Sequence, residues 1–410
     1  MTPPPHHPPA SGFHGLGIHA KILRILDDRK FTIPTPIQHQ SIPPAIQGKD
    51  LVGIAQTGTG KTFAFGIPML QRLAEHGGRG LILLPTRELA QQVEEALMTF
   101  APAFGIRMAV LIGGASMQRQ IEMIRSDPRI VVATPGRLND HLQQGTITLR
   151  EVKILVLDEA DRMLDMGFRP QIERILKHVP TERQTMLFSA TMPHEIMTLA
   201  NKHMKLPIRI EVAPTGTTAD RVEQELFIVP KDQKLQLLKT LLDQYRGTIL
   251  VFSRTKHGAK KITRAVQAMG HSAAEIHANR SLNQRRAALE GFKKGTHRIL
   301  IATDIAARGI DVTGIQVVIN FDIPDDAGDY VHRIGRTARA GREGRAITFA
   351  SPEQKDGIRK IEKLIRSTLK RTPLPPLPPP LPRAPEPERQ HQRPSHHGGR
   401  SGRPPRRHFR

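Results

Sequence analysis

Short runs of apolar and β-branched residues alternate with longer amphipathic stretches along most of this chain, and this alternation restricts its fold more than any other feature. Each run has the length of one buried strand, and each longer stretch has the apolar spacing of a helix. Strands that alternate with helices predict parallel sheets covered by helices. In the first half of the chain the runs lie at 51–54, 81–84, 130–132, 154–157 and 186–188.

The same alternation begins again after residues 213–221, a segment rich in turn residues and poor in apolar ones. This composition is typical of a linker between domains. We therefore predict two α/β domains, at 13–212 and 222–370, joined by that linker. No short-period repeat is visible, so the two halves would share an architecture and not residues. The runs of the second half lie at 226–229, 249–252, 299–302, 317–321 and 346–349.

The two ends of the chain have compositions that do not favour packing. Residues 1–12 are rich in proline and histidine, and we predict a flexible leader there. Residues 371–410 carry a proline block and then an end rich in Arg, His and Gly, and we predict a disordered tail. The arginine-rich end is typical of segments that bind RNA through charge and guanidinium stacking. A tail that only increases solubility is the alternative.

The charge of the chain indicates a polyanionic partner. Sixty-one Lys and Arg against 38 Asp and Glu give a formal net charge of +23, which points to nucleic acid, or else to an acidic membrane surface. No apolar run is long enough for a membrane span, and the N-terminus lacks the apolar core of a secretion signal, so we expect a cytoplasmic protein. Because there is no cysteine, disulfides, thiolate metal sites and cysteine nucleophiles are excluded.

A glycine-rich segment at 55–62 follows a strand pattern and precedes a helical one, which is the context of a phosphate-binding loop. Its backbone N–H groups can surround phosphate oxygens at the start of the helix, where Lys61 adds a positive charge. The Thr62 hydroxyl can bind Mg²⁺. For this segment alone, a plain glycine-rich turn is the alternative. The candidate nucleotide-binding residues are Thr57, Gly58, Thr59, Gly60, Lys61 and Thr62.

Two carboxylates, Asp158 and Glu159, follow the apolar run at 154–157, where α/β sheets usually bind ligands. Asp158 is suited to hold Mg²⁺, and Glu159 is suited to position and deprotonate the water that attacks the γ-phosphate. Capping of a helix is the alternative role for acids at this place, in particular for Asp161. With the glycine-rich loop, these acids predict an ATP-hydrolysing site that uses Mg²⁺.

The sequences Ala-Gln-Thr-Gly-Thr-Gly-Lys-Thr at 55–62 and Asp-Glu-Ala-Asp at 158–161 resemble those of the DEAD-box family of superfamily 2 RNA helicases. The resemblance implies two tandem RecA-like domains and an RNA-stimulated ATPase. Such an enzyme separates short RNA duplexes or remodels RNA–protein complexes with little sequence preference. The resemblance also implies that Phe13, Phe31 and Gln38 bind the adenine, with Gln38 pairing to its edge and an aromatic ring stacking on its face.

The other motifs of the family follow in order between residue 13 and about residue 370. The resemblance implies that segments 85–90, 113–114 and 134–137 contact the RNA backbone, although each taken singly could be only a helix cap or a turn. It implies that Ser189 and Thr191 link hydrolysis to strand separation, and their hydroxyls could contact 158–161; a helix cap is the alternative. The implied RNA-binding residues are Thr86, Arg87, Gly114, Thr134, Gly136, Arg137 and Thr303.

In the second domain, segments 302–311 and 332–339 are similar to the last two major motifs of the family. The resemblance implies that Arg336 and Arg339 neutralise the charge that develops on the γ-phosphate once the domains close. A surface salt bridge is the alternative role for both arginines. Asp311 would help to bind the nucleotide by accepting a hydrogen bond from a ribose hydroxyl. The residues implied in coupling are Ser189, Thr191, Arg308 and His332.

Two positions depart from the family pattern. Ala338 stands where glycine is common, and Leu282 stands where glutamine often precedes Arg285 by three residues, while Gln284 is displaced. The interdomain or RNA contact that the family makes with that glutamine is therefore not predicted for this chain.

The opening of the second domain at 222–229 and the basic tail look most like those of bacterial RhlE-type members. By analogy, ribosome assembly or RNA turnover is the expected setting, and the core is expected to be monomeric. Two alternatives stay open. One is a DNA translocase of the same superfamily, and the other is an ATP-gated RNA clamp or chaperone that unwinds little.

Overall fold

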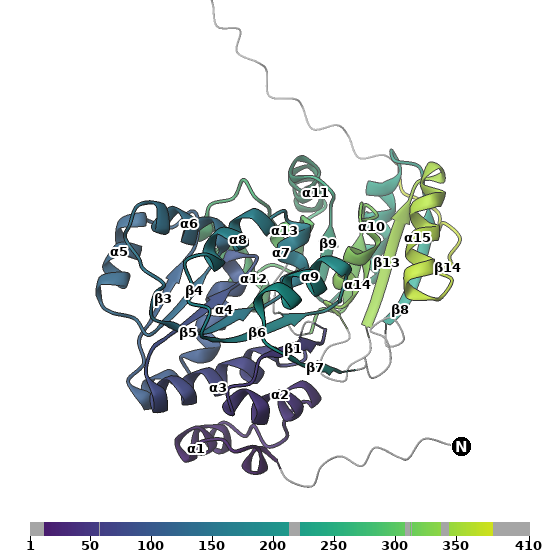
Figure 1. Ribbon diagram of the computed structural model, residues 1–410. Helices are drawn as coiled ribbons and strands as arrows, with labels where there is room; N and C mark the ends of the chain where they lie inside the picture. The colour runs from purple at the N-terminus through teal and green to yellow at the C-terminus, as the bar shows by residue number, and fades with distance from the viewer. Residues whose placement is uncertain are drawn as a thin grey trace, which may run out of the picture.

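The computed structural model describes residues 12–56, 58–212, 222–307, 312, 314–337 and 344–379. These residues form two seven-stranded sheets, in which every paired strand is parallel to its neighbour and helices cover the faces (Figure 1). The strand order is β3-β4-β2-β5-β6-β1-β7 in the first sheet and β10-β11-β9-β12-β13-β8-β14 in the second. The second sheet therefore repeats the topology of the first, and the predicted α/β fold with two parallel sheets is confirmed.

The first sheet is built from strands that are short and mostly buried on both faces. Its strands are β1 (Leu51–Ile54), β2 (Arg79–Leu83), β3 (Met108–Leu111), β4 (Ile130–Ala133), β5 (Val152–Leu157), β6 (Gln184–Ser189) and β7 (Ile208–Glu211). The helices are α1 (Ala20–Asp28), α2 (Pro36–Ile46), α3 (Lys61–His76), α4 (Arg87–Leu97), α5 (Met117–Arg125), α6 (Pro135–Gln143), α7 (Ala160–Asp165), α8 (Arg169–Leu176) and α9 (His194–His203), with 3-10 turns at Phe13–Leu16 and Ala101–Phe104.

The second sheet has the same construction. Its strands are β8 (Val222–Ile228), β9 (Ile249–Phe252), β10 (Ala273–Ile276), β11 (Ile299–Ala302), β12 (Val317–Asn320), β13 (Gly344–Ala350) and β14 (Lys370–Arg371). The helices are α10 (Lys234–Gln244), α11 (Lys256–Ala268), α12 (Leu282–Lys293), α13 (Asp304–Ala307), α14 (Ala327–Ile334) and α15 (Lys355–Ile365), with a 3-10 turn at Pro352–Gln354.

Alternate residues of each central strand enter different apolar clusters. In β4, for example, Ile130 and Val132 join the cluster on one face of the first sheet, while Val131 and Ala133 join the cluster on the other. This follows from the two-residue period of a strand, which points successive side chains to opposite faces. Because helices cover both faces, both sets of side chains are apolar, which explains why the central strands stand out as continuous apolar runs.

The ordered chain continues past the predicted end of the second domain. After β14 pairs with β8, the Thr372 N–H donates to the Leu226 carbonyl (2.9 Å) and the Gln236 amide donates to the Pro378 carbonyl (2.7 Å). Leu377 packs against the apolar cluster of the domain. The prediction of disorder from residue 371 onward is therefore wrong for 371–379. Leucines between the prolines supply apolar contacts, and prolines have little backbone freedom to lose on ordering.

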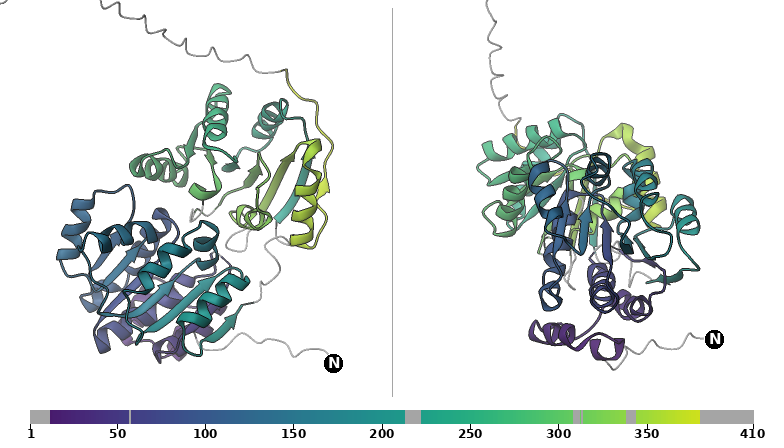
Figure 2. Two further views of the ribbon diagram at one scale, coloured as in Figure 1. Left: turned by 45° about the horizontal axis from the view of Figure 1, so that its top comes forward. Right: turned by 60° about the vertical axis from the view of Figure 1, so that its left-hand side comes forward.

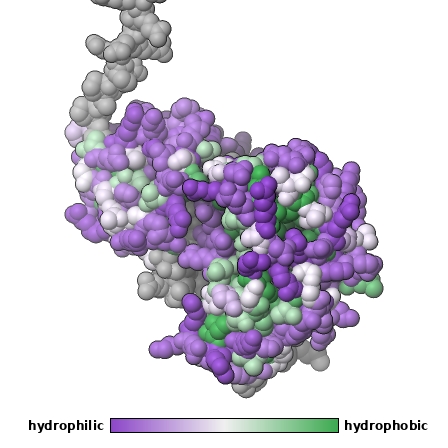
Figure 3. Space-filling model, turned by 90° about the vertical axis from the view of Figure 1, so that its left-hand side faces the viewer, coloured by the Kyte–Doolittle hydropathy of each residue, from purple (hydrophilic) through white to green (hydrophobic). Residues whose placement is uncertain are grey.

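The two domains lie in separate lobes that contact one another (Figure 2). Arg285 of α12 pairs with Glu88 of α4 across the boundary, at 2.8 Å between Nη2 and Oε2. Figure 3 shows one face of the molecule, which is largely hydrophilic and is hollowed between the two lobes. In the described parts of the chain, none of the helices combines the length and apolar character that a membrane crossing requires.

Candidate active site and RNA interface

The predicted phosphate-binding loop connects β1 to α3, as its sequence context indicated. Gly58 and Gly60 both adopt left-handed backbone conformations, with φ of 85° and 87°, which residues with side chains rarely adopt. A Cβ atom on Gly60 would lie 2.4 Å from the Gln38 side-chain nitrogen, so this position also lacks room for a side chain. Lys61 is buried, and its Nζ donates to the Ala55 carbonyl (3.1 Å). Thr57 lies outside the described residues.

The acidic pair follows β5 and faces this loop. Asp158 Oδ1 lies 4.0 Å from Lys61 Nζ and accepts a hydrogen bond from the Glu159 N–H (2.9 Å). Burial raises the pKa of Asp158 to about 6, while the charge of Lys61 opposes the shift and that of Glu159 adds to it. A carboxylate whose charge is this disfavoured gains from an additional cation. Asp158 and the Thr62 hydroxyl at the start of α3 are thus chemically suited to share a divalent cation with a phosphate group.

Glu159 has a strained backbone. Its φ is 51°, in the left-handed region, and the residue is only 3% exposed. Such a conformation costs about 1–3 kcal/mol in a residue with a side chain and occurs mostly at functional sites. The strain lets the chain turn sharply from β5 into α7. It holds the Glu159 carboxylate beside Arg162, whose Nε lies 3.9 Å from Oε2.

The motif at 189–191 bonds directly to the motif at 158–161. Asp161 Oδ2 accepts hydrogen bonds from the N–H groups of Ala190 (3.0 Å) and Thr191 (2.9 Å) and from the Thr191 hydroxyl (2.9 Å). The Ser189 hydroxyl accepts from the Asp161 N–H (3.3 Å). The predicted hydroxyl contact with the acidic loop is therefore confirmed, and Asp161 is the residue that receives it.

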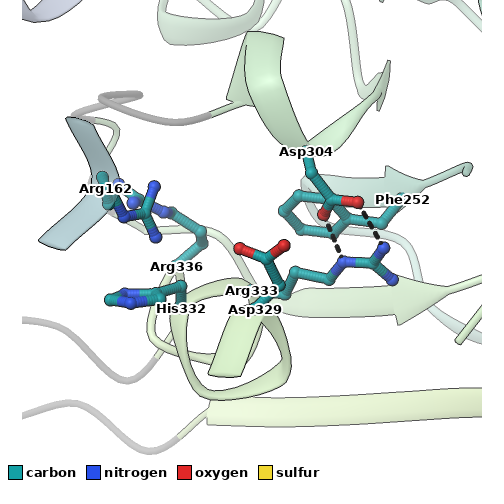
Figure 4. A pocket seen from close by; sticks show the side chains of 7 residues that line it. All are labelled: Arg162, Phe252, Asp304, Asp329, His332, Arg333 and Arg336. Carbon is teal, nitrogen blue, oxygen red and sulfur yellow. Dashed lines mark hydrogen bonds and ion pairs between the residues drawn. The ribbon is translucent and has the colours of Figure 1, made fainter. Parts of the chain in front are cut away.

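The second domain contributes positively charged residues to the same region. Helix α14 carries His332, and Arg336 follows its end; both line a pocket of about 150 Å³ together with Gln56, Ala190 and Thr191 of the first domain. A smaller adjoining pocket brings Arg336 close to Arg162 of the first domain (Figure 4). The space between the domains is therefore bounded by cationic side chains from both sides.

Helix α14 is fixed in place by Arg333. Its guanidinium donates to both carboxylate oxygens of Asp304 (2.5 and 2.7 Å) and lies over the Phe252 ring, with 5.0 Å between the guanidinium carbon and the ring centroid (Figure 4). It also donates to the Asp322 carbonyl (2.6 Å). A guanidinium held from several sides is rigid, so it orients the helix that presents His332 and Arg336. The predicted residues Arg308, Asp311 and Arg339, and also Ala338, lie outside the described part of the chain.

The three residues predicted to bind adenine occupy different environments. Phe31 is 43% exposed and rests against the Phe63 ring at 5.4 Å between centroids. Gln38 accepts from the Thr35 N–H (2.9 Å) and donates to the Gly60 carbonyl (3.0 Å), which ties α2 to the phosphate-binding loop. Phe13 is only 3% exposed and belongs to the apolar core. The prediction that Phe13 contacts the nucleotide is corrected, because its ring is enclosed by protein.

The predicted RNA-binding segments of the first domain come together at one edge of the sheet. They follow β2, β3 and β4, which are neighbours, so their carboxyl ends meet. Arg87 lies against the turn after β3, where a Cβ on Gly114 would sit 2.2 Å from its Nη1, and Gly114 has a φ of 76°. Arg137 donates to the Ala115 carbonyl (3.1 Å) and so joins the third segment to that turn.

The remaining predicted RNA-binding residues stand at the starts of helices. The Thr86 hydroxyl accepts from the Leu89 N–H (3.3 Å) and caps α4, while Thr134 and Gly136 lie where α6 begins. In the second domain, Thr303 follows β11 and its N–H donates to the Ile276 carbonyl (3.3 Å). Amide groups and hydroxyls at helix starts are common phosphate-binding groups, so these positions suit contacts with an RNA backbone.

Four residues that shape the site were not predicted: Glu88, Arg162, Arg285 and Arg333. Glu88 and Arg333 stand inside the motifs at 85–90 and 332–339, and Arg285 was noted only as a reference for the Leu282 departure. Their partners are distant in sequence. A charged residue within an otherwise apolar helix pattern could have indicated a buried pairing, but not the identity of the partner.

Comparison with known proteins agrees with this geometry. Residues 35–199 match the family model described as DEAD/DEAH box helicase, and residues 233–341 match the model of the helicase conserved C-terminal domain. The chain belongs to the DEAD-box family of ATP-dependent RNA helicases. The two matches fall on the two sheets, so this helicase consists of tandem RecA-like domains.

The similarity of this helicase to named relatives extends over most of its length. It is 43% identical over 364 residues to the ATP-dependent rRNA helicase RRP3 of Eremothecium gossypii, covering 88% of this chain and 75% of the relative. It is 42% identical over 368 residues to the DEAD-box ATP-dependent RNA helicase CshA of Geobacillus kaustophilus, covering 89% and 79%. These names support the family but not the RhlE-type subgroup.

A solved structure with bound ligands has the same fold. S. cerevisiae Dbp5 bound to RNA and ADP BeF3 superposes with a TM-score of 0.79 at 29% identity, covering 89% of this chain and 96% of Dbp5. Because the superposition includes both domains, the domains of this helicase are arranged much as in that RNA-bound structure. The chain thus hydrolyses ATP and acts on RNA as a helicase.

Proposed function

We propose that this helicase hydrolyses ATP in a site divided between its domains, and that closure of the two domains on RNA completes that site. The observation that carries the proposal is the pocket in which His332 and Arg336 of the second domain face Gln56 and Thr191 of the first. The acids and the phosphate-binding loop lie in one domain, whereas these cationic groups lie in the other. Each ligand that contacts both domains favours the closed state, so ATP and RNA reinforce each other's binding.

The first domain supplies the groups that bind the nucleotide and activate water. Lys61 and the amides of residues 57–62 hold the phosphates, and Phe31 and Gln38 contact the adenine. Glu159 accepts a proton from the attacking water and orients it in line with the γ-phosphate. The burial of Glu159 beside Arg162 supports this role, because a base that is enclosed and fixed needs little reorganisation.

We assign Mg²⁺ to Thr62 and Asp158. When bound, it would neutralise part of the charge on the phosphate oxygens. The raised pKa of Asp158 supports the assignment, because a nearby divalent cation would restore the ionised form. In the described residues no group of three or more His or acidic side chains could hold a metal by itself, which agrees with a cation shared with the nucleotide.

The second domain supplies transition-state stabilisation and coupling. Arg336 neutralises charge that develops on the γ-phosphate, and Arg339 of the same motif is assigned the same role from sequence. His332, together with Ser189, Thr191 and Arg308, transmits the state of the nucleotide to the interface. The direct bonds between Thr191 and Asp161 support this coupling, because they connect the acidic loop to the segment that faces the second domain.

RNA binds through its backbone to both domains. Thr86, Arg87, Gly114, Thr134, Gly136 and Arg137 serve the first domain, and Thr303 serves the second, while Asp311 is assigned to the ribose of the nucleotide. Contacts of this kind carry no base information, so binding has little sequence preference. If closure bends one strand, a continuous A-form duplex no longer fits, and a short duplex separates locally.

One set of assays tests this function. We expect ATPase activity to be stimulated by RNA much more than by DNA, and ATP to permit displacement of a strand from a short RNA duplex. Equal stimulation by DNA with directional movement would identify a DNA translocase instead. ATP-dependent RNA retention without strand displacement would identify an RNA clamp. Lys61→Ala provides the control that lacks nucleotide-driven activity.

The cellular setting is a further proposal. We infer precursor ribosomal RNA or RNA-turnover assemblies as substrates, because one relative is named an rRNA helicase. A bacterial, cytoplasmic location and a monomeric core remain predictions from sequence. Cell fractionation and RNA crosslinking of the native protein test them directly; crosslinks confined to RNAs unrelated to ribosomes or decay would contradict the proposed setting.

A further inference from the structure

Helix α12 belongs to the second domain, but its first residue packs on the first domain. Leu282 is half-buried against an apolar cluster whose other members all lie between residues 13 and 212. The next residue, Asn283, is exposed. The first turn of α12 therefore carries an apolar interdomain contact at the position where the family often has glutamine.

The same face of α12 carries the interdomain ion pair. Arg285 lies three residues after Leu282, hence on the same side of the helix, and pairs with Glu88 of α4 at 2.8 Å. Both side chains are at least nine-tenths buried, and burial raises the pKa of Glu88 while Arg285 opposes that shift. Beyond the approach of Arg285, the described residues give neither Glu88 carboxylate oxygen a well-aligned side-chain hydrogen bond.

A buried ion pair with such incomplete hydrogen bonding contributes little net affinity, because desolvation of the two charges offsets their attraction. The pair does fix how α12 sits on α4, because any shift between the two helices would leave Glu88 or Arg285 buried without its partner. The favourable free energy must then come from neighbouring apolar surface removed from water. In this contact, Leu282 is the side chain placed to provide it.

The contact lies beside the RNA interface. Glu88 follows Thr86 and Arg87, and Arg87 rests against the turn at 113–114. We propose that Leu282 is a positioning residue that docks α12 on the start of α4 and thereby couples closure of the domains to RNA binding. This inference rests on the proposed function. The apolar contact replaces whatever a glutamine at this position would provide.

The test measures coupling between nucleotide and RNA in the full chain. The affinity for a fluorescent single-stranded RNA is determined with and without ADP–BeF3, and the ratio of the two dissociation constants is the coupling factor. For Leu282→Ala we expect this factor to fall about fivefold, because the variant loses part of the free energy gained when the leucine side chain is buried. Leu282→Ser should lower it further, and Leu282→Met should retain it, because methionine fills a similar volume.

Two controls separate coupling from folding. Asn283→Ala changes the adjacent exposed side chain and should leave the coupling factor unchanged. ADP–BeF3 binding without RNA should stay the same in Leu282→Ala, because the loop at 55–62 belongs to the first domain and Leu282 to the second; its loss would indicate a general defect and overturn the proposal. Should an alanine variant prove unstable, Leu282→Met and Leu282→Val still provide a graded series in side-chain volume.

The outcomes distinguish this inference from the function on which it rests. A parent protein without any coupling between ADP–BeF3 and RNA contradicts the proposed function itself. A parent that couples normally, with Leu282→Ala and Leu282→Ser equal to Asn283→Ala, contradicts only the role of Leu282. A fall in the alanine and serine variants, reversed in the methionine variant, supports the positioning role.

Discussion

The two domains have the same strand order but differ at the equivalent strand ends. In the first domain, β1 leads into the glycine-rich loop and β5 into the acidic pair Asp158 and Glu159. In the second, the equivalent strands β8 and β12 lead into a Val-Pro-Lys segment and into Phe321-Asp322. Asp322 there accepts from Lys234 Nζ (3.1 Å) and from the Arg254 N–H (3.1 Å), which are contacts within the domain. One topology therefore supports a nucleotide site in only one of two copies.

This difference explains why the two domains contribute different groups to the catalytic site. The first domain contains a nucleotide loop whose Lys61 forms an ion pair with Asp158, whereas the second presents cations from a helix that Arg333 fixes to Asp304 and Phe252. These contacts lie within each domain and hold its groups in place. The rate of hydrolysis is therefore expected to depend on the contact between the halves more than on rearrangement within either.

Removal of the second-domain cation should have the largest effect. We expect Arg336→Ala to lower RNA-stimulated ATP hydrolysis by about 10³-fold, as for other arginines that neutralise a transferring phosphoryl group. Nucleotide binding should change little, because the loop at 55–62 is intact. Steady-state phosphate release measures the effect, with the exposed Arg359→Ala as control. Equal loss in both variants, or none in Arg336→Ala, would show that the second domain is not part of the catalytic site.

Removal of the general base in the first domain comes next. We expect Glu159→Gln to lower the hydrolysis rate by about 10²- to 10³-fold while RNA binding with ATP persists, because the variant cannot complete the cycle. Single-turnover phosphate release and RNA retention are measured together. Unchanged phosphate release would reject the assignment of Glu159. Loss of RNA retention would indicate that the left-handed turn at residue 159 had changed its conformation.

The pH dependence of nucleotide binding tests the buried acid of the first domain. The pKa of Asp158 is raised to about 6, and only the ionised form holds Mg²⁺, so affinity should weaken as pH falls through that value. The ionised fraction of a group with this pKa rises about tenfold between pH 5 and pH 7. Calorimetric titration with Mg²⁺–ADP measures the affinity at each pH. Asp158→Asn is the control, because any pH dependence that it keeps does not come from the Asp158 carboxylate. Identical profiles for both proteins would disprove the assignment.

Shortening the tail should have the smallest effect on the enzyme. Removal of residues 380–410 takes away arginines at 383, 389, 393, 400, 403, 406, 407 and 410, so RNA affinity should fall severalfold and its dependence on salt should flatten. Basal ATPase should remain. Truncation at 371 should in addition lower the melting temperature of the second domain, because residues 372–379 pack on it. A salt slope unaffected by the first truncation would exclude the tail from RNA binding.

The sequence predicted the centre of each sheet and not its edges. The strands that were not predicted are β3, β7, β10 and β14, and these are the outer strands of the two sheets. Central strands are buried on both faces and form continuous apolar runs, but three of the four residues of β7 are exposed and β14 has two charged residues. An edge strand is specified by the strand that it pairs with, and the sequence of the edge strand alone does not identify that partner.

The site was predictable where its chemistry lies in consecutive residues. The loop at 55–62, the acids at 158–161 and the contact from 189–191 lie close together in space as expected. The contacts of Arg285 with Glu88 and of Arg333 with Asp304 join distant segments and depend on the fold. Phe13 was assigned to the nucleotide from the resemblance, but the packing of its 3-10 turn encloses it.

Nucleotide and RNA together are expected to close the domains into one catalytic site. Because the chain has no cysteine, single cysteines at Glu95 on α4 and Lys293 on α12 allow specific dye labelling of both domains for single-molecule energy transfer. We expect a population with a shorter distance between the dyes, which becomes dominant only when an ATP analogue and single-stranded RNA are both present. A separation that is the same with neither ligand and with both would contradict it.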